Sequence, residues 1–184
     1  VYFISYSKNV GKGWALRKAF AYAIESGFTH AITIDSDGQH FAKDLPAFIN
    51  KISENSNDVI IGARNMETAS VPGGSSFGNR VSNFWFKVET GINCPDTQSG
   101  YRLYPLQSLK NMRFITRKYE FEIEVLVRAA WKGIDIISVP VTVYYAPREE
   151  RISHFRPYKD FFRISILNTL LVLIAFLYIK PRDF

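Results

Sequence analysis

Two acidic residues separated by one position, Asp35 and Asp37, follow an apolar run and have the spacing to hold a metal ion. The run, Ala31 to Ile34, is rich in β-branched residues, which is typical of a buried strand. Ligands gather at the carboxyl ends of strands in an open α/β sheet, where two carboxylates need a cation to neutralise them. Mg²⁺ or Mn²⁺ suits such oxygens and leaves coordination positions for phosphate. The alternative is an ordinary turn, because Asp37-Gly38 is common turn chemistry.

Basic side chains follow the neighbouring strands of the expected sheet. The loop 9–13 offers Lys12 and backbone N–H groups to a phosphate, although a Gly-Lys-Gly sequence is often only a turn. Arg64 follows another strand, and Arg80 falls in a later helix. Both arginines are candidate phosphate clamps, and the alternative for each is surface charge that aids solubility.

The elements that must position these side chains alternate between strand and helix. The pattern predicts strands at 1–4, 31–34 and 58–62, with helices between them at 14–26 and from Asp44 through Ile52. This order favours a parallel sheet of the α/β class. Further along, the pattern predicts helices at 77–91, 106–112 and 120–132 and an irregular polar segment at 94–104. It also predicts a strand at 134–145, which Pro140 makes an edge strand or a bulged one.

The composition is that of a globular chain with an anionic partner. The 184 residues are 47% hydrophobic and 22% charged, which is enough for one domain with a real core. The net charge of +6 favours phosphate, nucleic acid or a membrane surface without choosing among them. Cys94 is the single cysteine, which excludes an intrachain disulfide and favours a reducing compartment. The chain opens without Met, inside an expected strand, so we expect a fragment.

An apolar segment lies close to the C-terminus. Ile164 to Ile179 carries four polar side chains and no charge, and Phe161 to Ile179 approaches the roughly 20 residues that span a bilayer. Lys180 and Arg182 follow it, as is typical of a membrane interface. The alternative is a buried C-terminal helix, although an all-round apolar helix is hard to bury in so small a domain.

Four segments, taken together and in this order, resemble family 2 inverting glycosyltransferases of the GT-A fold, particularly the dolichyl-phosphate mannosyltransferase and polyprenyl-phosphate glycosyltransferase branch. They are NVGKGWALR at 9–17, DSDGQH at 35–40, IIGAR at 60–64 and DTQSGYR at 96–102. The resemblance covers nearly the whole chain, but the N-terminal nucleotide-binding strands of the family are missing. It implies an α/β fold: a Rossmann-like, mostly parallel sheet flanked by helices, with a C-terminal apolar helix. Residues 1–150 would form the catalytic domain, and 151–184 a basic loop and a membrane-associated helix.

The resemblance also implies roles for individual residues. Asp35 and Asp37 match the DxD motif that holds the metal, Mg²⁺ or Mn²⁺, and Gln39 matches a position that reaches toward it. Asp37 and Asp96 are the implied catalytic acids, with Asp96 on the acceptor side. The arginines at 64, 80 and 102 would face phosphates or support the acceptor loop, and the segment around Ser153 resembles a loop that closes over the diphosphate. The implied substrate-binding residues are Lys12, Arg64, Arg80, Gln98, Arg102, Ser153 and Arg156.

The implied activity is transfer of a sugar from a nucleotide-sugar donor to a polyprenyl (dolichyl-type) phosphate or a cell-envelope glycan. It would take place at the cytoplasmic face of a membrane, and we expect no nucleic-acid partner. A phosphate acceptor is already ionised at pH 7, whereas a hydroxyl acceptor would need a base, for which Asp96 is the candidate. One alternative is a non-catalytic, membrane-associated remnant of the fold. Another is a DxDG phosphatase with Asp35 as nucleophile, which Gln39 and the preceding strand and helix disfavour.

Overall fold

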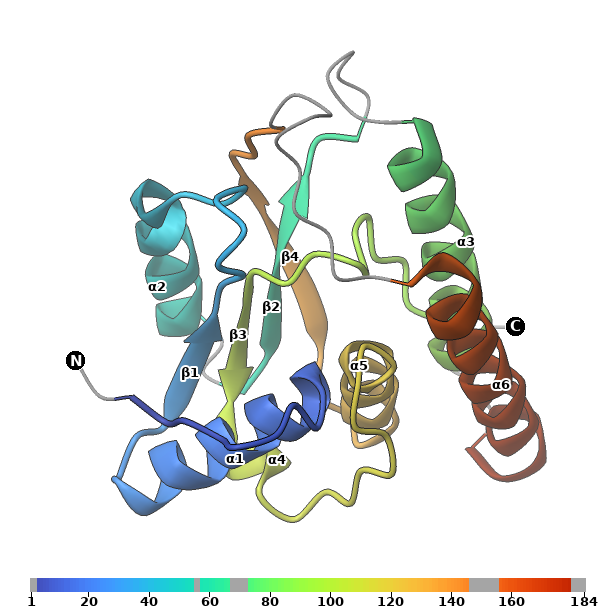
Figure 1. The fold of residues 1–184 in the computed structure, drawn as a ribbon, viewed down its shortest axis with the longest axis horizontal. Coiled ribbons are helices and arrows are strands. Elements are labelled where there is room, and N and C mark those ends of the chain that lie inside the picture. The colour runs from blue at the N-terminus through green and yellow to red at the C-terminus, as the bar shows by residue number, and fades with distance from the viewer. Residues whose placement is uncertain (1–2, 55–56, 67–72, 146–155, 180–184) are drawn as a thin grey trace.

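The computed structural model describes residues 3–54, 57–66, 73–145 and 156–179, and it has a central sheet with helices on both faces (Figure 1). The α/β architecture predicted from the sequence is confirmed. In chain order the elements are α1 (Lys12–Glu25), β1 (His30–Thr33), a 3-10 turn (Ala42–Asp44), α2 (Leu45–Glu54), β2 (Val59–Arg64), α3 (Gly73–Thr90), β3 (Arg102–Pro105), α4 (Leu106–Leu109), α5 (Phe121–Trp131), β4 (Ile136–Val141) and α6 (Pro157–Ile174), which continues as a π-helical turn, η3 (Ala175–Ile179).

The sheet has the order β1-β3-β2-β4, with β3 antiparallel to both of its neighbours and β2 parallel to β4. Three strands therefore point the same way, and β3 runs against them. The predicted irregular segment 94–104 is wrong at its end, because β3 begins at Arg102. The sequence pattern did not predict this strand because its first residue, Arg102, is charged. The predicted strand 1–4 lies partly outside the described residues, and residues 3–6 form no strand.

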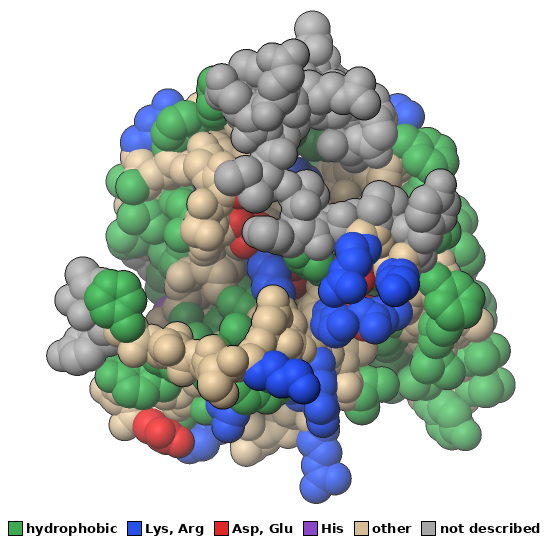
Figure 2. All heavy atoms as spheres, in the orientation of Figure 1, with side chains coloured by type: hydrophobic (Ala, Val, Ile, Leu, Met, Phe, Trp, Pro, Cys, Tyr) green, Lys and Arg blue, Asp and Glu red, His purple; other side chains and the backbone are tan. Residues whose placement is uncertain are grey.

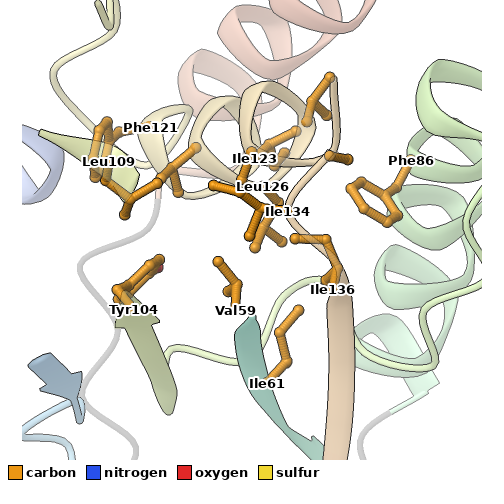
Figure 3. Packing of buried hydrophobic residues seen from close by; sticks show 14 of the residues in the cluster. Val59, Ile61, Phe86, Tyr104, Leu109, Phe121, Ile123, Leu126, Ile134 and Ile136 are labelled. Atoms are coloured by element: carbon orange, nitrogen blue, oxygen red, sulfur yellow. The ribbon is translucent and has the colours of Figure 1, made fainter. Parts of the chain in front are cut away.

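Two apolar layers pack on the opposite faces of the sheet. Successive residues of β2 point to opposite sides, so that Ile60 meets Phe48 of α2 while Val59 and Ile61 meet the larger cluster around α5. Figure 3 shows this larger cluster, in which side chains of α5 lie over the sheet and Phe86 approaches from α3. Each fully buried side chain of this size contributes about 1.5–3 kcal/mol relative to exposure. This packing on both faces holds the strands in place, and with them the polar residues that follow the strand ends.

The strand β4 confirms the prediction of an edge strand. It lies last in the sheet order, and Pro140 pairs in register with Ala63 of β2. Proline has no N–H to donate, so it is tolerated where one side of a strand has no partner. The C-terminal end of β4 then leads past Val143, which forms an isolated bridge with His40. This bridge brings the chain after β4 beside the acidic turn that follows β1.

The C-terminal helix packs with one face and exposes the other. Leu167, Leu171 and Ala175 are almost wholly buried, and α6 contacts α3. The segment Lys159–Ile179 is long and apolar enough to cross a membrane, by length and composition, and 22% of it is buried inside the protein. Figure 2 shows hydrophobic side chains gathered over α6. The large exposed apolar residues of this helix are Phe161, Phe162, Ile166, Leu170, Leu173, Phe176, Leu177, Tyr178 and Ile179.

Candidate active site

The strand ends bring the sequence motifs to one edge of the sheet. Because β3 is antiparallel, its first residue lies beside the last residue of β1, and Thr33 pairs with Arg102. The hydroxyl of Thr33 also donates to the carbonyl of Gly100 at 2.9 Å. The acidic turn after β1, the end of β2 and the loop before β3 therefore meet. A fully parallel sheet would not have placed the segment 96–101 there.

A lysine bridges two carboxylates at this edge. Lys12, the first residue of α1, lies 2.7 Å from Asp35 Oδ1 and 2.9 Å from Glu122 Oε2 in the first turn of α5. Burial lowers the pKa of Lys12, but the carboxylates of Glu122 and Asp35 outweigh it and raise this pKa above its ordinary value. The ammonium group is therefore held charged between the helices and the acidic turn.

The glycines around Lys12 serve close packing. A Cβ at Gly13 would collide with Phe121 at the start of α5, and Gly11 has a φ of 116° and lies against the backbone of Arg117. The sequence predicted that this loop presents backbone N–H groups to a phosphate. The N–H of Trp14, directly after this loop, donates to the carbonyl of Arg117 at 2.9 Å. A phosphate contact of the loop's own N–H groups stays a prediction. What the loop brings to the site is the side chain of Lys12.

Asp35 and Gly100 approach each other so closely that no side chain fits between them. A Cβ at Gly100 would collide with the carboxylate of Asp35. The side chain of Asp35 is 35% exposed, so one part of the carboxylate faces the glycine and Lys12 while another part reaches solvent. Gly100 thus places the loop before β3 directly behind the first acid of the DxD pair.

Asp37 and Gln39 form the open side of the acidic turn. Asp37 is exposed, and its Oδ1 accepts a hydrogen bond of 3.0 Å from the backbone N–H of Gln39. This geometry is the turn that aspartate commonly makes two residues ahead. Gly38 between them has a φ of 75°, which a glycine adopts without strain. Since Asp37 is exposed and its other oxygen has no hydrogen bond to another described residue, a ligand can reach this carboxylate from solvent.

The strongest polar contact at this edge joins Arg64 to Asp96. The guanidinium donates from Nε to Oδ2 at 2.6 Å and from Nη2 to Oδ1 at 2.9 Å, and the backbone N–H of Arg64 adds a third bond of 3.1 Å. Asp96 is fully buried. Burial lowers the pKa of Arg64, but its bonds to Asp96 outweigh this effect and keep that pKa raised. Two planar groups in this arrangement form a rigid clamp.

The loop before β3 is anchored to α3 as well as to Arg64. The side-chain amides of Asn79 and Asn83 donate to the carbonyl of Pro95 at 3.1 and 2.7 Å. Asn83 also accepts from the backbone N–H of Thr97 at 2.9 Å, and the Thr97 hydroxyl donates to Ser82 at 2.8 Å. The loop is therefore fixed before any ligand arrives.

Arg102 supports this loop from inside and does not face a phosphate. It is fully buried, and it donates to the carbonyls of Ser99, Thr97 and Glu122 at 2.6, 2.8 and 2.7 Å. A further bond of 3.2 Å joins it to the hydroxyl of Tyr104. Of the two roles that the resemblance implied, support of the acceptor loop agrees with these contacts. Phosphate contact does not, because the guanidinium donors point at protein carbonyls.

Arg80, Gln98 and Arg156, three further predicted substrate residues, contribute no side-chain bond to the contacts given above. Arg80 is exposed on α3, and Gln98 is exposed with its amide 3.7 Å from where a Cβ at Gly78 would lie. Arg156 is exposed at the start of α6, where its backbone N–H donates to Asp160 at 2.8 Å. Ser153 lies outside the described residues. These four positions stay predictions.

Two residues to which the sequence assigned no role in binding or catalysis, Glu122 and His40, lie at the site. Glu122 shares Lys12 with Asp35, and the sequence placed it only in the helix predicted at 120–132, which the resemblance puts below the active site. The ring of His40 lies tilted against that of Tyr101, with ring centres 5.2 Å apart and 56° between the ring planes. Burial and the neighbouring Arg64 lower the pKa of His40, which favours the neutral imidazole. Its position directly after Gln39 could have marked it.

The acidic turn has donors of the type that a hard divalent cation needs. In the described ranges no group of three or more His, Cys, Asp or Glu side chains converges to hold a metal by itself. Asp37 is exposed and Asp35 partly so, hence both can supply carboxylate oxygens while a ligand completes the coordination. This incomplete set fits a cation that arrives with a diphosphate, and it does not fit a permanently bound structural metal.

Comparison with known proteins gives a consistent assignment. The sequence profile described as "Glycosyl transferase family 2" matches residues 1–113. The chain is 27% identical over 143 residues to the undecaprenyl-phosphate mannosyltransferase of Micrococcus luteus, covering 72% of this chain and 56% of that protein. It is 29% identical over 147 residues to the UDP-N-acetylglucosamine–dolichyl-phosphate N-acetylglucosaminyltransferase of Methanococcus voltae, covering 77% and 59%.

Solved structures share the fold. Glucosyl-3-phosphoglycerate synthase from Mycobacterium tuberculosis, in complex with Mn²⁺, UDP-glucose and phosphoglyceric acid, superposes with a TM-score of 0.58 at 15% identity. The alignment covers 95% of this chain and 57% of that one. The chain therefore spans little more than half the length of these relatives.

Proposed function

The chain belongs to glycosyl transferase family 2, and on that premise we propose that it forms part of an enzyme that moves a sugar from a nucleotide-sugar donor to a polyprenyl phosphate. The observation that carries the proposal is the meeting of Asp35 and Asp37 with Lys12 and the Arg64–Asp96 clamp at one sheet edge. Carboxylates for a cation and basic groups for phosphates are what transfer from a diphosphate leaving group requires. Both relatives described above carry polyprenyl- or dolichyl-phosphate in their names.

The acidic turn is proposed to bind a divalent cation, Mg²⁺ or Mn²⁺, together with the donor diphosphate. Asp37 is the principal ligand because its carboxylate is exposed, while Asp35 is already paired with Lys12. Gln39 follows in the same turn and is the third proposed ligand residue. When bound, the cation stabilises the negative charge that develops on the leaving diphosphate.

Lys12 is proposed to balance charge at the donor site. Its ammonium lies between Asp35 and Glu122 in the free protein and offsets the repulsion between the two carboxylates. A diphosphate that approaches Asp37 brings further negative charge within reach of the same ammonium. Lys12 can then share its three N–H donors between Asp35 and a phosphate oxygen. The raised pKa keeps the group charged throughout.

The state of Asp96 favours a phosphate acceptor over a hydroxyl. The sequence named Asp96 as the base that a hydroxyl acceptor needs, yet its carboxylate is fully buried and both oxygens accept bonds from Arg64. A base must accept a proton from the substrate, and a carboxylate held in this way has no oxygen free to reach one. A polyprenyl phosphate is already ionised at pH 7 and needs no such base. We therefore propose that Asp96 orients Arg64.

The exposed face of α6 is proposed to lie on the membrane that carries the acceptor. Leu167 and Leu171 hold the helix against the protein, so α6 runs along the domain and does not project from it. A helix packed in this way presents its apolar face to the interface without crossing the bilayer. The basic residues in the N-terminal part of α6, which include Lys159 and Arg163, suit the headgroup region. This arrangement supports an interfacial helix, and we propose that it lies at the cytoplasmic face that the resemblance implies.

The test is metal-dependent donor binding by Asp37→Ala. We expect calorimetry with UDP or GDP and Mn²⁺ to show binding by the full chain and at least tenfold weaker binding by the variant. The melting temperature should change little, because exposed Asp37 supports no buried partner. Glu25→Ala, which removes an exposed acid from α1, is the matched control and should bind normally. Undiminished binding by Asp37→Ala would refute the proposed site.

A further inference from the structure

A second pocket lies at the opposite end of the sheet from the acidic turn. It has a volume of about 410 Å³, within the range of roughly 300–1,000 Å³ typical of small-molecule sites. Its walls come from the segment after α4, the C-terminal half of α5 and the end of α6 with η3. The lining residues are Asn111, Met112, Arg113, Arg128, Trp131, Lys132, Ile174 and Ile179.

The topology separates this pocket from the candidate active site. Arg64 and the acidic turn lie at the end of β2, whereas Asn111, Met112 and Lys132 also line a neighbouring pocket that Asn57 and Ile134 complete. Asn57 precedes β2 and Ile134 precedes β4, and these two strands are parallel. The length of a six-residue strand, roughly 15–20 Å, therefore lies between the two sites. The second pocket cannot be a part of the donor site.

The charges of the pocket are of one sign. Arg113, Arg128 and Lys132 line it, and no carboxylate is among its described lining residues. The Nε of Arg128 donates a hydrogen bond of 2.7 Å to Glu124 Oε1. The other two guanidinium nitrogens of Arg128 can therefore bind a ligand. Neither Arg113 nor Lys132 forms a salt bridge within the ranges that the structure describes, and both are exposed. Three cations around one hollow attract a phosphate group.

The other wall of the pocket is apolar and continues into the exposed face of α6. Ile174 and Ile179 belong to this helix and its π-helical end, and Met112 faces them. Trp131 is fixed by a bond of 2.8 Å from its indole N–H to the carbonyl of Glu89. An indole with one polar edge and an apolar body is typical of a membrane interface. The pocket therefore joins a phosphate-binding side to a hydrocarbon-binding side.

The neighbouring pocket adds room for a polar headgroup. It has a volume of about 240 Å³, and its lining combines the polar side chains of Asn57, Ser108 and Asn111 with Ile134 and the shared Met112 and Lys132. Amide and hydroxyl groups both donate and accept hydrogen bonds, so they suit a polyol. Together the two pockets offer, in sequence, an apolar wall, a cationic centre and a neutral polar end.

We propose that this composite pocket binds the headgroup of an anionic membrane phospholipid, with its phosphate between Arg113, Arg128 and Lys132 and its acyl chains along the end of α6. The order of apolar, cationic and polar surfaces matches that of a phosphatidylglycerol-type lipid. Such a lipid would hold the C-terminal end of α6 at the membrane, away from the donor site. The site is independent of the proposed transfer and needs neither metal nor nucleotide.

The test uses a short-chain, water-soluble phosphatidylglycerol below its micelle concentration, titrated calorimetrically into the full chain. Arg113→Ala/Lys132→Ala removes two exposed cations and should bind at least tenfold more weakly, because each cation near an anionic headgroup adds about fivefold. Lys18→Ala/Lys43→Ala removes the same charge from exposed positions elsewhere and should bind like the wild type. Melting temperatures of both double variants check that the fold is intact.

Two further arms decide what the pocket recognises. Asp37→Ala should retain lipid binding, so failure of the donor site leaves this result unchanged. Glycerol 3-phosphate should bind much more weakly than the lipid, since it lacks the acyl chains that Ile174 and Ile179 contact. Equal affinity for glycerol 3-phosphate would overturn the lipid assignment in favour of a soluble phosphate ester. An equal loss of binding in both double variants, or no binding by the wild type, would overturn the site itself.

Discussion

Glu89 makes the stability of this protein depend on pH in an unusual direction. It lies on α3, is fully buried, and neither carboxylate oxygen has a hydrogen-bond partner among the residues that the structure describes. Burial raises its pKa from 4.5 to about 8. The folded protein therefore carries Glu89 as a neutral acid at pH 7, whereas the unfolded chain ionises it. Because the folded pKa is the higher one, this contribution to stability is complete below about pH 4.5 and is lost as pH rises through 8.

The size of the effect follows from these two pKa values. Linkage gives a loss of about 2.5 kcal/mol in the free energy of unfolding between pH 5 and 7, and about 1.4 kcal/mol more between pH 7 and 9. Glu89→Gln removes the titration and keeps the size of the side chain. We therefore expect the difference in unfolding free energy between this variant and the wild type to grow by roughly 4 kcal/mol from pH 5 to 9.

The measurement is urea unfolding at pH 5, 6, 7, 8 and 9. Subtracting the wild-type curve from that of Glu89→Gln cancels all other titrating groups, including His40, whose lowered pKa acts in the acid range. Glu25→Gln, at an exposed position of α1, is the matched control and should run parallel to the wild type. If Glu89→Gln also runs parallel, the carboxyl group is not held neutral in the folded state and the reasoning fails.

Two further variants probe the sheet edge. Arg64→Ala leaves the buried carboxylate of Asp96 without its partner, and we expect urea unfolding to show a loss of roughly 3–5 kcal/mol; a loss below about 1 kcal/mol would contradict a structural role for the clamp. Gly100→Ala drives a methyl group into Asp35, and we expect at least tenfold weaker binding of UDP or GDP with Mn²⁺ in calorimetry. Gly78→Ala, whose nearest neighbours lie 3.7 Å away, is the control, and equal binding by both glycine variants would exclude the proposed contact.

Periodicity predicted the helices well, because each has one apolar face, and continuous β-branched runs predicted β1 and β2. The helix expected at 120–132 is α5, and the strand expected at 58–62 is β2. The pattern failed at β3, where Arg102 interrupts an otherwise apolar run. That guanidinium is satisfied by carbonyls of the chain itself, and such compensation is invisible before the fold is known. A reader of the sequence therefore sees a polar loop where the protein has a central strand.

The site was predictable in its residues and less so in their partners. The DxD spacing identified Asp35 and Asp37, and the resemblance identified Asp96, but no local pattern pairs residues 32 positions apart as Arg64 and Asp96 are. The same holds for Glu122, which reaches Lys12 only because α1 and α5 begin side by side. Gly100 looked like a loop glycine, and its contact with Asp35 depends on the direction of β3.

The position of β3 also governs when this protein can fold during synthesis. β1 and β2 are synthesised before β3. They do not pair with each other in the finished sheet, and each pairs with β3, residues 102–105. At 5–20 residues per second, the ribosome takes on the order of seconds to deliver β3 after β2. During that interval the nascent chain carries two open apolar strands, which are natural targets for chaperones. The acidic turn can meet Gly100 only after the chain has been made as far as β3.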